Sequence, residues 1–201
     1  MQLDIYQVDA FTDKLFGGNP AAVIPLEHWI DEALMQKIAM ENNLAETAFF
    51  IPQGDDFELR WFTPELEIDL CGHATLATAH IIFTQLGYTR KDIRFHTLKA
   101  GTLTVSRTEN LYTLDFPSRL AEVCEIPAGL LEALGGNQPV EVLRSRDYML
   151  VYQSEADVRA LKPDFNALSK IDALGIIVTA RGDNSDFVSR FFAPAAGINE
   201  D

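Results

Sequence analysis

One carboxylate stands in a stretch of otherwise small or apolar residues. Glu46 lies within residues 43–50, which read NLAETAFF. If this stretch is extended, Glu46 shares a face with Ala48 and Phe50, and that face is expected to be buried. A carboxylate there loses hydration, which favours its protonated form and makes it a better proton shuttle near neutral pH. Position alone favours the alternative, a glutamate at a strand end that is paired with an arginine such as Arg60.

Three consecutive residues with useful chemistry, Cys71, Gly72 and His73, stand at the predicted start of a helix. The first turn of a helix offers N–H groups and a partial positive charge, which suit a carboxylate or a phosphate. Gly72 allows a ligand to approach the backbone closely, and His73 can donate a hydrogen bond or relay a proton. The same partial positive charge at the helix start would favour the thiolate form of Cys71. The alternatives are a core cysteine and a capping histidine.

Neither a metal site nor a cysteine nucleophile is predicted. His73 and His80 are on one face of the predicted helix, but no third ligand has helical spacing to them and no HExxH motif occurs. Cys71 and His73 stand two positions apart at a helix start, so we expect their side chains to point in different directions. Residues 17–20 lack the Lys-Ser/Thr of a P-loop and the spacing of a dinucleotide fold, and they predict a turn.

The composition indicates an ordinary soluble globular protein. The chain has 201 residues, of which 47% are hydrophobic and 23% charged, enough for one large domain or two small ones. A net charge of −14 disfavours nonspecific binding to nucleic acid or to anionic membranes, but a small anionic substrate stays compatible with it. Two cysteines give no disulfide framework, which indicates a cytoplasmic location. The first residues lack the pattern of a signal peptide, and no apolar run approaches the roughly 20 residues that span a bilayer.

The pattern of the first half predicts short strands around one buried helix. Residues 72–84 are apolar on all sides of the helical wheel and too short to span a membrane, so they predict a central helix enclosed by strands. Asp31 is expected to cap an earlier helix. Strands are expected at residues 3–8, 21–24, 47–51, 57–63, 93–97, 102–106 and 112–116.

The second half repeats the order of strands, helix and strand pair. Residues 117–127 are interpreted as a linker that contains Cys124. Helices are expected at residues 128–134, 155–161 and 165–171, and strands at 140–143, 148–152, 174–179 and 187–193. A counterpart of the buried helix is missing from this half.

Two segments, 57–73 and 187–201, match without gaps. Five pairs are identical: Phe57 and Phe187, Arg60 and Arg190, Phe62 and Phe192, Pro64 and Pro194, and Ile68 and Ile198. A duplicated unit implies two equivalent halves and a site where they meet, with Cys71 set against Asp201. Under this hypothesis roughly 45 more residues belong after Asp201, so we expect the sequence to be incomplete. A chance match is the alternative.

Several motifs in order closely resemble the PhzF-type family of phenazine-biosynthesis-like isomerases. They are the segments at 8–23, 43–50, 60–80 and 190–201, and the likeness covers nearly the whole chain. The resemblance implies the α+β fold of diaminopimelate epimerases. In that fold two pseudo-symmetric halves each form a mostly antiparallel, barrel-like sheet around a central helix. Here the halves would be residues 1–117 and 128–201, with the second half truncated before its central helix.

The resemblance also implies a site in the cleft between the halves, a homodimer, and no cofactor or metal. Glu46 corresponds to the family's proton-moving glutamate, His73 to the histidine of the G-H-A motif, and Asp201 to the aspartate of the second-half N-E-D motif. Related epimerases carry a cysteine at each of two symmetric positions. This chain has Cys71 at one and Asp201 at the other, which argues against racemisation by two cysteines.

The leading prediction is a cofactor-independent isomerase that moves a proton on a small carboxylate-bearing substrate by general acid/base catalysis. Glu46, His73 and Asp201 would be catalytic, and Cys71, Gly72 and His73 would bind the substrate. Two alternatives stay open. One is a non-catalytic small-molecule-binding protein on the same fold, and the other is an amino-acid epimerase or racemase, which needs a second base opposite Cys71.

Overall fold

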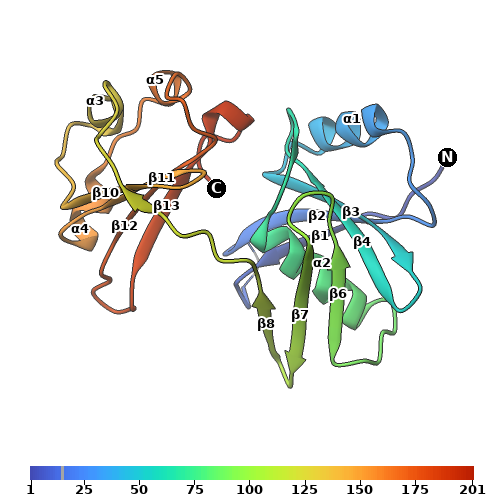
Figure 1. The fold of residues 1–201 in the computed structure, drawn as a ribbon. Coiled ribbons are helices and arrows are strands. Elements are labelled where there is room, and N and C mark those ends of the chain that lie inside the picture. The colour runs from blue at the N-terminus through green and yellow to red at the C-terminus, as the bar shows by residue number, and fades with distance from the viewer. Residues whose placement is uncertain (15) are drawn as a thin grey trace. The chain divides into compact units, whose positions relative to one another are not determined.

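The structure, a computed structural model, describes residues 1–14 and 16–201. The chain divides into two compact units, Met1–Pro117 and Ser118–Asp201 (Figure 1). The first unit carries most of the residues that the sequence singles out for chemistry. No helix in the described part of the chain is long and apolar enough to cross a membrane.

The first unit is built on one mixed, mostly antiparallel sheet. Its strands are β1 (Tyr6–Ala10), β2 (Asn19–Pro25), β3 (Glu46–Gln53), β4 (Asp56–Phe62), β5 (Glu67–Ile68), β6 (Asp92–His96), β7 (Thr102–Thr108) and β8 (Leu111–Asp115). The sheet order is β1-β2-β3-β4-β6-β7-β8, with β5 paired to β4. Among the residues of this unit that the structure describes, only the pairs β2–β3 and β4–β6 are parallel. The predicted α+β class is confirmed.

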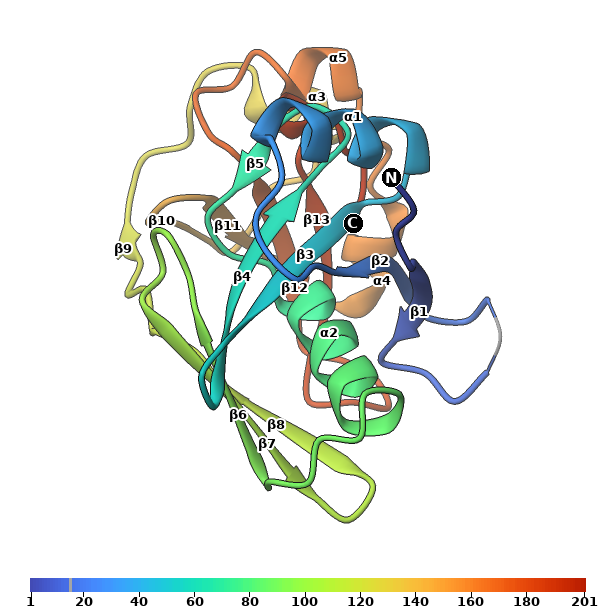
Figure 2. The ribbon, with the colours of Figure 1, turned by 90° about the vertical axis from the view of Figure 1, so that its right-hand side faces the viewer.

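Helix α2 (Gly72–Thr84) has the predicted bounds and lies inside the curl of this sheet (Figure 2). It is rich in alanine, a strong helix former, and it ends shortly before Gly87, whose φ of +68° favours glycine. The helix packs against β1, β2, β3 and β8. Leu76 and His80 are only half-buried, so the sheet does not cover the helix on every side as predicted.

Helix α1 (Glu32–Asn42) covers the other face of the sheet. Asp31 caps it as predicted, because its carboxylate accepts a hydrogen bond from the backbone N–H of Leu34 at 3.2 Å. Met35 and Ala39 pack on a second apolar cluster, formed by Ile24, Leu26, Phe49 and Phe62. Strands β2 to β4 therefore have apolar residues on both faces, and the first five residues of β3 are all buried. The face of β3 predicted to be buried is buried, and the opposite face, with Thr47 and Phe49, is buried as well.

The second unit has its own sheet and its own core. The strands are β9 (Glu122–Val123), β10 (Glu141–Arg144), β11 (Tyr148–Val151), β12 (Ile176–Ala180) and β13 (Val188–Phe192), in the order β13-β12-β11-β10-β9. Short helices lie between or after these strands: α3 (Leu130–Leu134), α4 (Glu155–Ala160), α5 (Phe165–Leu168) and η1 (Pro194–Ala196). Because β9 pairs with β10, part of the predicted linker belongs to this sheet.

The two sheets share a pattern of pairing over four consecutive strands. The order antiparallel, parallel, antiparallel holds for β1 to β4 and for β10 to β13. The matched sequence segments begin with β4 and β13, and their arginines make the same contacts. Arg60 lies over the Phe62 ring and binds the Glu67 carboxylate. In the same way Arg190 lies over the Phe192 ring and binds the carboxylate of Glu200.

Candidate active site

Glu46 is the first residue of β3 and is buried, with 3% of its surface exposed. Alternation along the strand places it on the same face as Ala48 and Phe50, as predicted. Both of these residues belong to the cluster that packs around α2. Glu46 pairs in register with Ala21 of the neighbouring parallel strand, which also belongs to that cluster. The carboxylate is therefore directed toward the start of α2.

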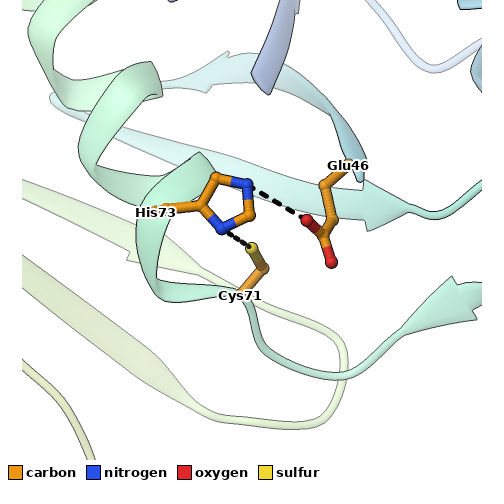
Figure 3. Close-up of side chains that lie close together, drawn as sticks. All are labelled: Glu46, Cys71 and His73. Carbon is orange, nitrogen blue, oxygen red and sulfur yellow. Dashed lines mark hydrogen bonds and ion pairs between the residues drawn. The ribbon is translucent and has the colours of Figure 1, made fainter. Parts of the chain in front are cut away.

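His73, the second residue of α2, meets this carboxylate. Its Nε2 lies 3.1 Å from Oε2 of Glu46, and both side chains are almost fully buried (Figure 3). The contact is close, but it lacks the direction of a straight hydrogen bond. Catalytic hydrogen bonds are often poorly aligned before substrate binds.

The alternative prediction, that Glu46 pairs with an arginine such as Arg60, was wrong. Arg60 binds Glu32 at 2.6 Å and Glu67 at 2.7 Å instead. The reason is the register of β3 and β4. Arg60 pairs with Phe49, whose side chain lies on the face covered by α1, whereas Glu46 faces α2.

Cys71 also approaches His73, at the other ring nitrogen. Its Sγ lies 3.5 Å from Nδ1 of His73 (Figure 3), so the expectation that the two side chains point apart was wrong. The physical reason is that Cys71 precedes the helix in an extended conformation, with φ −137° and ψ 122°. Its Cβ therefore does not follow the helical rotation. The thiol is buried and does not cap the helix.

Asn19 is the residue of this cluster that the sequence analysis missed. It begins β2, and its side-chain Nδ2 lies 3.1 Å from Nδ1 of His73. Alternation puts Asn19 on the same face as Ala21 and Val23, which pack around α2. In the sequence Asn19 belongs to a glycine-rich turn, and only its place at the start of a strand distinguishes it from an ordinary turn residue.

The cluster is compact (Figure 3). Glu46, Cys71 and His73 have potential ligand atoms within 4.8 Å of one another, a spacing that a metal ion could use. The two ring nitrogens of His73, however, face different partners, Nδ1 toward the thiol and Nε2 toward the carboxylate. An ion binds a histidine through one nitrogen, and its ligands surround one point. Each ring nitrogen therefore has its own partner, an arrangement that suits proton movement through the imidazole.

A cavity lies elsewhere in the first unit. It has a volume of about 790 Å³ and is lined by residues of β1, of the following loop, of α2 and of β8, including Asp9, Lys14, His80 and Tyr112. Nδ1 of His80 is 3.1 Å from the Tyr112 hydroxyl, so His80 does not join His73. Burial, together with the charge of Arg107, lowers the pKa of His80. None of the cluster residues lines this cavity.

Two further predicted site residues have different surroundings. Gly72, the first residue of α2, is half-buried, and an added Cβ would meet only the Phe116 ring, at 3.8 Å. Asp201 lies in the second unit and is exposed, and its backbone N–H donates to the carbonyl of Phe191 at 3.0 Å. A catalytic role for Asp201 beside Glu46 and His73 stays a prediction.

Comparison with known proteins gives consistent matches over the whole chain. Residues 8–201 match the family model described as phenazine biosynthesis-like protein, PhzC-PhzF. A relative from Pseudomonas aeruginosa named "uncharacterized isomerase" is 50% identical over 100% of this chain and 77% of its own length. The crystal structure of a PhzF-family phenazine biosynthesis protein from Enterococcus faecalis is 48% identical, with a TM-score of 0.89 over 100% of this chain and 77% of that chain. A predicted epimerase of Pseudomonas aeruginosa, 19% identical with a TM-score of 0.69 over 99% of this chain and 76% of that chain, shares the fold.

Proposed function

Because the chain belongs to the PhzC-PhzF family of phenazine biosynthesis-like proteins, we propose that it is an isomerase that moves a proton on a small carboxylate-bearing substrate. The observation that carries the proposal is the buried contact of 3.1 Å between Glu46 and His73. A buried carboxylate beside an imidazole is a suitable pair for general acid/base catalysis, because the site excludes water and both groups exchange protons. The name of the relative supports isomerase chemistry at the level of the family.

Glu46 is the group that takes a proton from a substrate carbon and returns it to another position. Only one base is needed if the carboxyl group stays beside the substrate during both transfers. His73 positions the carboxylate and supports proton movement. Asp201 is expected to complete the set from the second unit, as the family resemblance implies.

The start of α2 is the place for the substrate carboxylate. The helix has 13 residues, so its first turn carries N–H groups and the partial positive charge of the helix dipole. Gly72 leaves the backbone open there, and the Cys71 side chain does not occupy the cap. These donors hold the substrate next to Glu46 and stabilise negative charge that develops on its carboxylate.

Three further expectations belong to the proposal. The family resemblance favours a reaction without a cofactor and a homodimer, and the use of cysteine favours the cytoplasm. Analytical ultracentrifugation at several concentrations tests the dimer.

The variant Glu46→Gln tests the proposal. Glutamine keeps the shape of the side chain and can accept a hydrogen bond from His73, but it cannot take a proton. Across a panel of small carboxylic acids, we expect kcat to fall by roughly 10²–10⁴-fold while the dissociation constant of the substrate changes little. Glu41→Gln, which changes an exposed glutamate of α1, is the matched control. Unchanged kcat in Glu46→Gln would remove Glu46 from this role.

The distance of 3.5 Å between Cys71 and His73 favours a second candidate, an amino-acid epimerase with a thiolate base. In that case Cys71→Ser abolishes racemisation of a chiral amino acid. The isomerase proposal predicts only a small effect of Cys71→Ser on turnover, so the same variant separates the two candidates.

A further inference from the structure

His73 has different partners at its two ring nitrogens. Nδ1 faces the side-chain amide nitrogen of Asn19 at 3.1 Å and the thiol of Cys71 at 3.5 Å. Nε2 faces the carboxylate of Glu46 at 3.1 Å. His73 and Cys71 are both buried, so water does not readily replace these partners.

The partners determine where the imidazole proton lies. An amide nitrogen has two N–H groups and no lone pair for a hydrogen bond, so it can only donate. Nδ1 must then be the acceptor, and the single proton of a neutral imidazole must be on Nε2, which faces Glu46. We propose that Asn19 is a positioning residue that fixes His73 in the Nε2–H tautomer and so presents the Nε2 proton to the carboxylate of Glu46, the base that begins the reaction. The role of Glu46 as the base rests on the proposed function, whereas the tautomer of His73 does not.

The same geometry predicts the state of Cys71. A thiolate at 3.5 Å would face the lone pair on Nδ1, which repels it, whereas a thiol can donate its S–H to that lone pair. An imidazolium with a proton on Nδ1 would direct that proton at the N–H groups of Asn19. The ion pair of thiolate and imidazolium that activates a catalytic cysteine is therefore disfavoured. Asn19 thus favours the isomerase over the epimerase that uses Cys71.

The backbone around Asn19 holds the amide in place. Asn19 pairs with Ala10 of β1, and Gly18 precedes it. A Cβ on Gly18 would lie 2.1 Å from the carbonyl oxygen of Ala10, so only glycine allows the two strands to approach this closely. The close strand pair fixes the start of β2, and with it the direction of the Asn19 side chain.

The test is the tautomer of His73, measured by NMR on protein with isotope-labelled histidine nitrogens. The chain has four histidines, and the His73 signals are assigned by their loss in His73→Gln. In the wild type we expect the shift of an unprotonated nitrogen at Nδ1 and of a protonated nitrogen at Nε2. A proton on Nδ1 of neutral His73 in the wild type would overturn the proposal, whatever the variants do.

Asn19→Asp should reverse the tautomer, because a carboxylate accepts a hydrogen bond from Nδ1–H and cannot donate to Nδ1. Asn110→Asp, in an exposed turn, makes the same change of charge away from His73 and should leave the wild-type pattern. If Asn19→Asp melts like Asn110→Asp and still shows the Nε2–H tautomer, Asn19 does not fix it. If Asn19→Asp does not fold, the wild-type spectrum alone decides.

Turnover separates this proposal from the proposed function. We expect Asn19→Asp to lower kcat by roughly 10²–10⁴-fold with little change in KM, because Nε2 of His73 no longer presents a proton to the Glu46 carboxylate. A reversed tautomer with unchanged kcat would keep the positioning role and contradict its link to catalysis. Full activity of Glu46→Gln would contradict the proposed function and leave the tautomer result standing.

Discussion

Gly72 can be tested apart from the residues that move protons. An added methyl group has room in the fold, because its nearest neighbour would be the Phe116 ring at 3.8 Å, and alanine favours helix over glycine by up to about 1 kcal/mol. If substrate approaches the backbone here, the same methyl group obstructs it. We expect Gly72→Ala to keep or raise the melting temperature while it raises KM at least several-fold. Unchanged KM would move the substrate away from the start of α2.

The site was predictable from the sequence only in part. Glu46 and His73 stand in distinctive local patterns, and the structure places them in contact. The position of Cys71 depended on the extended backbone before the helix, which the spacing of two residues does not reveal. Asn19 could not be found, because its contact with His73 joins residues 54 positions apart. Such a contact depends on the packing of β2 against α2, and local pattern carries no information about it.

At the scale of elements, the cap of α1 gives a simple stability test. Asp31 accepts a hydrogen bond from Leu34 N–H, one of the backbone donors that the helix itself leaves without an acceptor. Asp31→Ala should lower the free energy of unfolding by about 1 kcal/mol, measured by urea denaturation. Glu41→Ala, at the other end of the same helix, is the control and should change it by less than about 0.5 kcal/mol. Equal effects of the two variants would contradict the capping role.

Helix α4 is attached to the loop before β13 through Glu155. This carboxylate accepts a hydrogen bond from the backbone N–H of Asp183 and binds Arg159, and these two contacts lower the pKa of Glu155. A lowered pKa in the folded state means that the unfolded chain takes up the proton first as pH falls. Glu155 therefore stabilises the fold above the ordinary pKa of a glutamate, and this contribution is lost as pH falls through the lowered value.

We expect Glu155→Gln to make stability less dependent on pH in that acidic range. Urea denaturation of wild type and variant at a series of acidic pH values measures the difference. The two proteins should differ most near neutral pH and converge as the native carboxyl group becomes protonated. A constant difference across the range would contradict the assignment.

The sequence predicted a helix or strand well where one local sequence pattern was strong. The run of alanine and apolar residues gave α2 its observed bounds, and Asp31 marked the start of α1. The first strand was expected at residues 3–8 but begins at Tyr6 and continues to Ala10. The pairing of β1 with β2 decides those bounds, and the apolar pattern of one strand does not show which residues pair with its neighbour. Burial of β3 on both faces likewise depends on α1, which alternation along one strand does not predict.

At the scale of the whole molecule, each unit has a core formed from its own residues. The clusters around α2 and under α1 draw only on the first unit, and the third cluster only on the second. We therefore expect residues 1–117, expressed alone, to fold and to unfold cooperatively in urea. Leu103→Ala, which removes a fully buried side chain of the first core, should lower the stability of this fragment by about 2–5 kcal/mol. A fragment without a cooperative transition would contradict a separate core.

In the proposed reaction the buried Glu46 moves a proton between a substrate carbon and its own carboxylate. The most direct measurement is deuterium incorporation at carbon when the full chain acts on a carboxylic-acid substrate in deuterium oxide, followed by NMR and mass spectrometry. We expect incorporation with the wild type and with Glu41→Gln, and none above background with Glu46→Gln. Undiminished incorporation by Glu46→Gln would show that Glu46 does not move this proton.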